Sequence, residues 1–243
     1  MAQASTPQIR AVLLDFDDTL INMKQAAYLA FNAALRSHGL RDVRFNEMLA
    51  NWDRSWKEVV KELAPTHQDV DVLVDKIGKA YFERFGETHL QSSVLLPGTI
   101  KVLKTLRAMK LKTAIVSRRR RRIIEEELDK FTIRPYIDTI VSREDVTQMK
   151  PAPHGVTLAA EQLQVPIEQC VMVGDSPNDL KAGKAAGTMT AAVLTGPYGI
   201  ETIRKEKPDI IVDQIADLVA ILERHLGGAS PEVLQKRTGE RKG

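Results

Sequence analysis

Five short apolar runs, each stopping at a polar residue, constrain the fold of this chain most strongly. The runs are rich in β-branched and small residues and show no regular polar alternation, which is typical of strands buried on both faces of a parallel sheet. Apolar residues at helical spacing lie between them. We therefore expect an α/β fold with a doubly wound, Rossmann-like parallel-sheet core. The five runs are Ala11–Leu14, Thr113–Val116, Ile137–Val141, Cys170–Val173 and Met189–Leu194.

The interval between the first two runs is too long for one crossover connection. Asp15 and Ser117, which follow these runs, are 102 positions apart. Aromatic and aliphatic residues between Asp15 and Ser117 recur at helical spacing. We interpret the aromatic residues as core packing among three or four helices. We therefore predict an inserted α-helical cap at residues 21–90 and a catalytic core at residues 1–20 and 91–226. Residues 227–243 are polar and are expected to form a flexible tail.

Composition narrows the class of protein without indicating its function. The chain has 243 residues, and its single cysteine, Cys170, excludes an internal disulfide and any zinc site built from several cysteines. No apolar run approaches the roughly 18 residues of a membrane span, and residues 1–10 do not resemble a secretory signal. The net charge of +3 is too balanced to require nucleic acid. We expect a cytoplasmic globular protein with no membrane association and no nucleic-acid partner.

Carboxylates follow two of the predicted strands. Asp15, Asp17 and Asp18 come directly after the first run, and Asp175 follows Gly174 at the end of another. The carboxyl ends of parallel strands share one sheet edge, where ligands bind in such folds. Clustered carboxylates there would repel one another unless a cation neutralised them, and Mg²⁺ prefers oxygen ligands. An acidic turn that caps a helix remains the alternative for the first group.

Four ordered motifs resemble those of the haloacid dehalogenase-like hydrolase superfamily. They are Asp15-x-Asp17-x-Thr19, Ser117 after an apolar strand, Lys150-Pro151, and Gly174-Asp175-Ser176-x-x-Asp179. Each is short, but their order and spacing together are specific. The resemblance covers about residues 9–215, and it extends to the phosphoglycolate phosphatase-type members, which carry a helical cap after the first motif.

The resemblance implies roles for four residues in catalysis. Asp15 would be the nucleophile that attacks phosphorus and forms an aspartyl-phosphate. Asp17 would protonate the leaving group and then activate water. Ser117 and Lys150 would hold the phosphoryl oxygens. Alternatively, Ser117 caps a helix that begins at Arg118, and Lys150 is an ordinary surface lysine.

The resemblance also implies a Mg²⁺ cofactor. Asp15, the backbone carbonyl of Asp17, and Asp175 would bind the ion, and Asp179 would support them from behind. Asp179 also stands three residues after Ser176. It could therefore equally be the acidic partner in a capping box at a helix start.

The sequence departs from the family pattern in three places. Asp18 replaces a usual glycine, and His154 replaces a common aspartate. The third departure is an arginine run, Arg118–Arg122, directly after Ser117. We hypothesise that Arg118 or Arg119 contacts a second anionic group of the substrate, because a guanidinium binds carboxylate or phosphate well. A solvent-exposed helix face, compensated by three glutamates at 125–127, is the alternative.

The motifs favour a Mg²⁺-dependent phosphatase that acts on a small phosphorylated metabolite. The resemblance implies a phosphomonoester such as phosphoglycolate, a sugar phosphate or a nucleotide. Asp17 argues against a dehalogenase, which needs no acid at that position. Two alternatives stay open, namely a phosphomutase on the same fold and a non-catalytic binding module that uses the arginine run.

Overall fold

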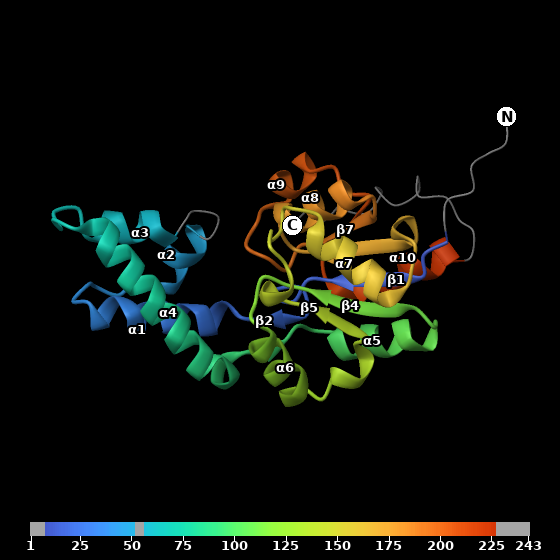
Figure 1. Ribbon diagram of the computed structural model, residues 1–243, viewed down its shortest axis with the longest axis horizontal. Coiled ribbons are helices and arrows are strands. Elements are labelled where there is room, and N and C mark those ends of the chain that lie inside the picture. Colours follow the sequence, from blue (N-terminus) through green and yellow to red (C-terminus); the bar gives the residue numbers. More distant parts are fainter. Residues whose placement is uncertain (1–7, 52–55, 227–243) are drawn as a thin grey trace, which may run out of the picture. The chain divides into compact units, whose positions relative to one another are not determined.

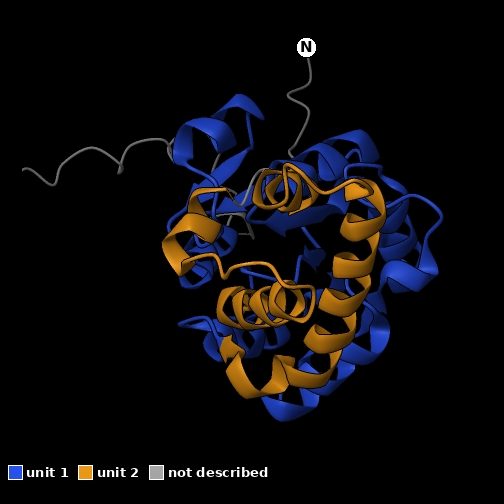
Figure 2. Cartoon of the chain, turned by 90° about the vertical axis from the view of Figure 1, so that its left-hand side faces the viewer, with its two compact units in different colours: residues 1–20, 95–243 blue, residues 21–94 orange. Residues whose placement is uncertain are grey.

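The computed structural model describes residues 8–51 and 56–226, with side chains described as far as residue 223. The chain divides into two compact units (Figure 2). Unit 1 comprises Met1–Leu20 and Leu95–Gly243, and unit 2 comprises Ile21–Val94. The tail predicted at residues 227–243 lies outside the described residues.

Unit 1 is built on a six-stranded sheet in which every neighbouring pair of strands is parallel. The strand order is β5-β4-β1-β6-β7-β8. This order confirms the doubly wound α/β core that the apolar runs predict. The strands are β1 (Ala11–Leu14), β4 (Lys112–Val116), β5 (Thr139–Val141), β6 (Cys170–Gly174), β7 (Met189–Val193) and β8 (Ile210–Val212).

The strand order creates a switch point beside β1. From β1 the chain adds β4 and β5 on one side, and it then returns to add β6, β7 and β8 on the other. Connections therefore diverge at the carboxyl ends of β1 and β6, which is where doubly wound sheets bind their ligands. Asp15 and Asp175 directly follow these two strands.

Helices cover both faces of this sheet (Figure 1). Helices α7 (His154–Leu163) and α8 (Pro177–Ala186) pack on one face, and α5 (Thr99–Ala108) and α10 (Ile215–Leu226) pack together on the other. The remaining helical segments of unit 1 are α6 (Arg121–Lys130), α9 (Ile200–Lys205) and three short 3₁₀ turns, η1 (Arg134–Tyr136), η2 (Arg143–Asp145) and η3 (Ile167–Gln169).

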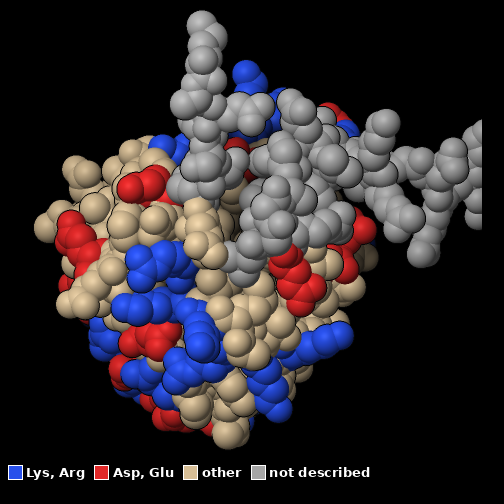
Figure 3. Space-filling model, turned by 90° about the vertical axis from the view of Figure 1, so that its right-hand side faces the viewer, with Lys and Arg blue, Asp and Glu red and all other residues tan. Residues whose placement is uncertain are grey.

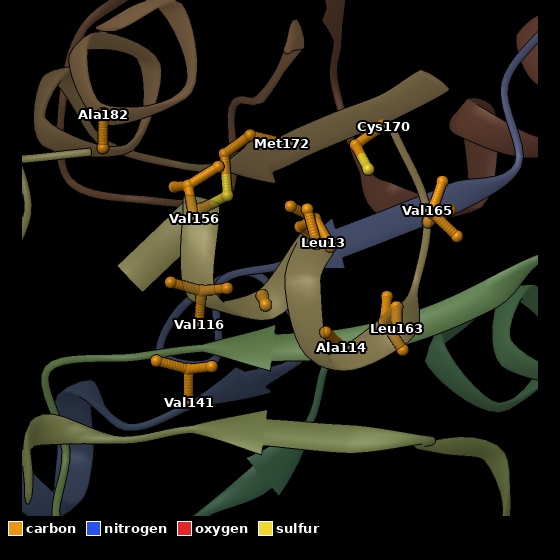
Figure 4. Close-up of a cluster of buried hydrophobic side chains, with 13 residues drawn as sticks. Leu13, Ala114, Val116, Val141, Val156, Leu163, Val165, Cys170, Met172 and Ala182 are labelled. Carbon is orange, nitrogen blue, oxygen red and sulfur yellow. The ribbon is translucent and has the colours of Figure 1, made fainter. Parts of the chain in front are cut away.

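The core of unit 1 lies between the strands and α7 (Figure 4). Leu13 of β1 and Met172 of β6 point toward Val156 of the helix, and all three side chains are fully buried. Cys170 is fully buried in the same cluster, as expected of a small core residue. Burial of such side chains supplies most of the favourable free energy of folding, and it fixes the sheet edge that carries the site.

Unit 2 is helical, which confirms the predicted insertion. Its helices are α1 (Lys24–Ser37), α2 (Phe45–Ala50), α3 (Trp56–Leu63) and α4 (Val70–Ser92), and short strands β2 (Ile21–Asn22) and β3 (Val94–Leu95) pair where the chain enters and leaves it. Phe31, Leu35 and Ile77 are buried in one cluster with Val60. The aromatic and aliphatic residues that recur at helical spacing therefore form a core. Trp52, another aromatic residue of this segment, lies outside the described residues. None of the helices in the described part of the chain has both the length and the apolar character that a membrane crossing requires.

Candidate active site

Two buried carboxylates occupy the switch point of the sheet. The backbone N–H of Asp15 donates to the carbonyl of Val173 at 2.8 Å, which continues the β1–β6 pairing by one residue. Asp175 follows Gly174 at the end of β6. Each aspartate is only 7% exposed. The parallel register thus brings together two acids that are far apart in sequence.

Lys150 lies at the centre of the site and is itself buried. Its ammonium donates to Asp15 Oδ1 at 2.5 Å, to Asp179 Oδ1 at 2.5 Å, and to the carbonyl of Val116 at 2.8 Å. All three donors of the ammonium are therefore used within the protein. The structure thus brings Lys150 inward to Asp15 and does not leave it on the surface.

Asp179 forms the capping box that the sequence offered and also contacts Lys150. Its Oδ2 accepts from the backbone N–H of Ser176 at 3.1 Å and from the Ser176 hydroxyl at 2.6 Å, and these bonds form a capping box at the start of α8. Its Oδ1 accepts from Lys150. Gly174 makes room for this arrangement, because a Cβ there would lie 2.3 Å from Asp179 Cγ. A side chain at position 174 would displace the carboxylate.

The site carries the donors and the charge that suit a divalent cation. Carboxylate oxygens of Asp15, Asp175 and Asp179 all lie within 4.8 Å of one another. Three carboxylates and one ammonium leave two negative charges in a buried position when all are ionised. Hard oxygen donors of this kind favour Mg²⁺ or Ca²⁺ over softer metals.

Burial shapes the ionisation of these groups. Removal from water raises the pKa of Asp15 from 3.8 to about 7, with the charges of Asp179 and Asp17 adding to the effect and Lys150 opposing it. Burial likewise raises the pKa of Asp175 well above its ordinary value, and Asp15 contributes next. For Lys150, burial acts to lower the pKa, but the attraction of Asp15 and Asp179 outweighs it and raises the pKa. The lysine therefore stays charged, and the net negative charge of the site depends on how many of the acids are ionised.

Asp17 points to a partner that the sequence did not indicate. Arg119 Nε donates to Asp17 Oδ2 at 2.5 Å, and the two side chains are 17% and 32% exposed respectively. The hypothesis that Arg119 contacts a substrate anion did not foresee that this guanidinium pairs with an acid of the chain itself. Arg118 is exposed on the same loop.

Ser117 lies one residue beyond β4, where its N–H donates to the carbonyl of Val141 at 2.9 Å. Its hydroxyl accepts from the backbone N–H of Arg119 at 3.2 Å. The alternative that Ser117 caps a helix from Arg118 is wrong, because α6 begins at Arg121 with Arg120 as its N-cap residue. The hydroxyl thus closes a short turn at the buried edge of the sheet.

The arginine run is divided between different environments. Arg121 Nη2 donates to Asp145 at 2.8 Å, and Arg122 pairs with Glu126 at 2.8 Å on the exposed surface of α6. The exposed-helix interpretation therefore fits Arg122 and fails for Arg119, which precedes the helix.

Three further residues line the site without having been assigned a role from the sequence. Asp18 has a left-handed backbone with φ of 55°, a conformation that glycine adopts most readily. The Thr195 hydroxyl donates to the Asp18 carbonyl, and a Cβ on Gly196 would lie 2.1 Å from Asp175 Oδ2. The sequence could have indicated Thr195 and Gly196, because they follow the apolar run of β7, whose carboxyl end lies at the same sheet edge as that of β6.

The chain matches the family model described as haloacid dehalogenase-like hydrolase over residues 12–193. This match spans the core strands from β1 to β7 as well as the helical insertion, and it ends before β8.

Curated proteins resemble the chain over nearly its whole length. A phosphoglycolate phosphatase from Aquifex aeolicus is 28% identical over 222 residues, which cover 90% of this chain and 99% of that protein. A pyrophosphatase PpaX from Listeria monocytogenes is 27% identical over 220 residues, covering 89% and 98%. Among solved structures, a predicted phosphoglycolate phosphatase from Haemophilus somnus has a TM-score of 0.78 at 23% identity, covering 88% and 98%. That likeness supports the fold.

The raised pKa of Asp15 predicts how the metal-free protein responds to pH. Its folded pKa of about 7 exceeds the ordinary 3.8, so the folded state binds the proton more tightly. Stability from this group is present at low pH and is lost as pH rises through about 7. Relative to Asp15→Asn, the parent protein should lose up to about 1.4 kcal/mol of unfolding free energy per pH unit in this range. Urea unfolding in EDTA between about pH 5 and pH 7 checks this, and parallel profiles would contradict it.

Proposed function

The chain belongs to the haloacid dehalogenase-like hydrolase family, and from that premise we propose that it is a Mg²⁺-dependent phosphatase of small phosphorylated metabolites that works through an aspartyl-phosphate at Asp15. The observation that carries this proposal is the environment of Asp15. Its buried carboxylate lies at the switch point of the sheet, 2.5 Å from the ammonium of Lys150, beside two further acids. A carboxylate so placed is a nucleophile with a fixed orientation and a cation at hand.

The first step transfers the phosphoryl group to the protein. An Asp15 oxygen attacks phosphorus, and the bond from phosphorus to the leaving oxygen breaks with its electron pair going to that oxygen. Asp17 in its protonated form gives the leaving oxygen a proton. Ser117 holds a phosphoryl oxygen, and Lys150 joins it by turning one of its three donors from a partner within the protein to the substrate. The positive charge of Lys150 offsets the negative charge gathered there.

The second step regenerates Asp15. A water molecule attacks the phosphorus of the aspartyl-phosphate while the Asp17 carboxylate accepts its proton. The bond between phosphorus and the Asp15 oxygen breaks, inorganic phosphate leaves, and Asp17 is again protonated for the next cycle. One residue thus acts first as acid and then as base, which its place two residues after the nucleophile allows.

The donor set at the sheet edge supports Mg²⁺ as the cofactor. We assign its binding to the carboxylates of Asp15 and Asp175 and to the backbone carbonyl of Asp17, with Asp179 as a supporting acid behind them. When bound, the ion supplies Lewis-acid neutralisation of the charge on the phosphoryl group and the carboxylates.

The substrate class follows from the curated relatives and the exposed arginine at position 118. The relatives are named for phosphoglycolate and for pyrophosphate, both small molecules with an anionic group beyond the phosphoryl group that is transferred. Arg118 lies next to Ser117, which we assign to phosphate binding, and its exposed guanidinium suits such a second anion. We therefore propose a small substrate with a second carboxylate or phosphate.

The alternative of a non-catalytic module that binds through its basic residues is less well supported. Figure 3 shows one face of the molecule on which Lys and Arg side chains are interleaved with Asp and Glu. The charges of mixed sign on this face do not create there the extended positive field that nucleic acid requires. Two arginines of the run also form ion pairs within the chain, Arg119 with Asp17 and Arg121 with Asp145.

Hydrolysis assays test the proposed activity directly. With Mg²⁺ the protein should release inorganic phosphate from phosphoglycolate, pyrophosphate or p-nitrophenyl phosphate, ranked by kcat/KM. Asp15→Asn should lose about 10³-fold or more of kcat, because it removes the nucleophile and leaves the fold intact. The exposed Asp129→Asn is the matched control and should keep parental activity.

Two outcomes would overturn this assignment. Absence of Mg²⁺-dependent turnover for every member of a broad phosphometabolite panel would exclude the phosphatase. Isomerised phosphosugar as the product, in place of inorganic phosphate, would identify a phosphomutase.

Metal binding is measurable apart from activity. Titration calorimetry should show Mg²⁺ binding to the parent protein with affinity that rises with pH, because the acids must be ionised to bind the ion. Asp175→Asn removes one ligand and should weaken binding about 10-fold or more, whereas Asp129→Asn should not change it. Equal affinity in Asp175→Asn and the parent would place the ion elsewhere.

A further inference from the structure

We propose that Arg119 is a positioning residue that holds the carboxyl group of Asp17 in place for proton transfer. This inference rests on the proposed function, because it assigns a supporting residue to the group that moves the proton. It replaces the substrate-binding role that the arginine run suggests for Arg119. Arg118 keeps that role in the proposed function.

The contact joins two loops that the sheet brings together. Asp17 follows β1, and Arg119 follows β4, which pairs with β1 in parallel so that Leu14 lies opposite Ile115. The two residues are 102 positions apart in sequence. Arg119 Nε donates to Asp17 Oδ2 at 2.5 Å, and only 17% of the arginine side chain is exposed. When Asp17 is ionised this bond is charge-assisted, and shielding makes it stronger than a pair on the open surface. When Asp17 is protonated for the first step, the proton lies on Oδ1 and Oδ2 still accepts from Arg119.

Arg119 is itself held on both sides of its backbone. Its N–H donates to the Ser117 hydroxyl at 3.2 Å, and its carbonyl accepts from the N–H of Arg143 at 2.9 Å. Arg143 begins the η2 turn, in which Asp145 accepts from the backbone N–H of Ser142 at 2.7 Å. A residue anchored at two backbone points loses little freedom when it orients a partner, and this is what a positioning group requires.

The Asp17 carboxyl depends on this contact for its orientation. Among the described residues, its buried Oδ1 has no hydrogen-bond partner, so the contact of Oδ2 with Arg119 fixes the plane of the group. Without the guanidinium, the side chain would be free to choose another rotamer. A proton donor that is misplaced by even about 1 Å loses much of its effect.

The neighbouring arginines do not share this arrangement. Arg121 binds Asp145 and the carbonyl of Ile140, and Arg122 pairs with Glu126 along α6. Arg120 is exposed at the N-cap position. Within the described run, the link to Asp17 belongs to Arg119, and Arg120 therefore offers a matched control with the same charge on the same loop.

The two possible roles of Arg119 predict different kinetics. A residue that binds a second substrate anion affects KM, and only for substrates that carry such an anion. A residue that positions Asp17 affects kcat, including for p-nitrophenyl phosphate, which has a single phosphate and no further anionic group. The effect should also vanish once Asp17 can no longer transfer a proton.

A double-mutant cycle with p-nitrophenyl phosphate and Mg²⁺ separates these roles. Arg119→Ala should lower kcat by about 10-fold or more with KM changed by less than about threefold. In the Asp17→Asn background, the further change Arg119→Ala should alter the residual kcat by less than about twofold, so that the same quantity is compared in all four proteins. Arg119→Lys keeps a cation within reach of Asp17 and should lose less kcat than Arg119→Ala, and Arg120→Ala should match the parent protein.

The outcomes are distinct from those of the proposed function. If the parent protein turns over but Arg119→Ala raises KM with kcat unchanged, or the two substitutions act additively, the positioning role is overturned and the phosphatase stands. If the parent protein does not turn over any phosphorylated substrate, both fail. Arg119→Lys gives the same kcat-against-KM comparison if the alanine variant does not fold.

Discussion

The rest of the site depends on the buried ion pairs that the ammonium of Lys150 forms with Asp15 and Asp179. The ammonium lies between Asp15 and Asp179, and without it two carboxylates would face each other out of reach of water. Removing one partner of a buried ion pair typically costs about 3–5 kcal/mol, because the remaining charge has no compensation. Yet one lysine cannot balance the three acids that include Asp175. Burial, with the neighbouring acids adding to it, raises the pKa of Asp15 and Asp175. The same imbalance that costs stability in the metal-free protein favours a divalent cation.

The fold supplies this arrangement through close approaches at one edge of the sheet. The register of β1 against β6 places Asp15 and Asp175 side by side, and Gly174 leaves room for Asp179 to reach Lys150. Gly196, after β7, approaches Asp175 in the same way. The scaffold therefore fixes the charged groups through backbone positions, and the fully buried strand residues behind them keep those positions rigid.

The sequence predicted the features that depend on local pattern. The strand runs, the helical insertion and the acids after β1 and β6 could be read directly, because buried parallel strands and helices leave distinct periodicities. The partner of Arg119 could not be read, since it depends on how two loops pack across adjacent strands. The sequence also placed the start of α6 too early, at Arg118 instead of Arg121. The backbone of Arg119 bonds to Ser117 and Arg143, and these contacts keep the residues before Arg121 out of the helix. Hydrophobic periodicity does not report such loop contacts. The serine at position 117 looked like a helix cap because its hydroxyl does bind a backbone N–H, but that N–H belongs to a turn before the helix.

The central claim is that Asp15 becomes phosphorylated during turnover. Acid quenching of the protein in steady-state turnover, followed by proteolysis and mass spectrometry, measures this most directly. We expect a phosphoryl adduct on Asp15 that disappears in Asp15→Asn and that hydroxylamine removes, as it does other acyl phosphates. Turnover of substrate with the phosphoryl group on another residue, or on none, would show that Asp15 is not the nucleophile.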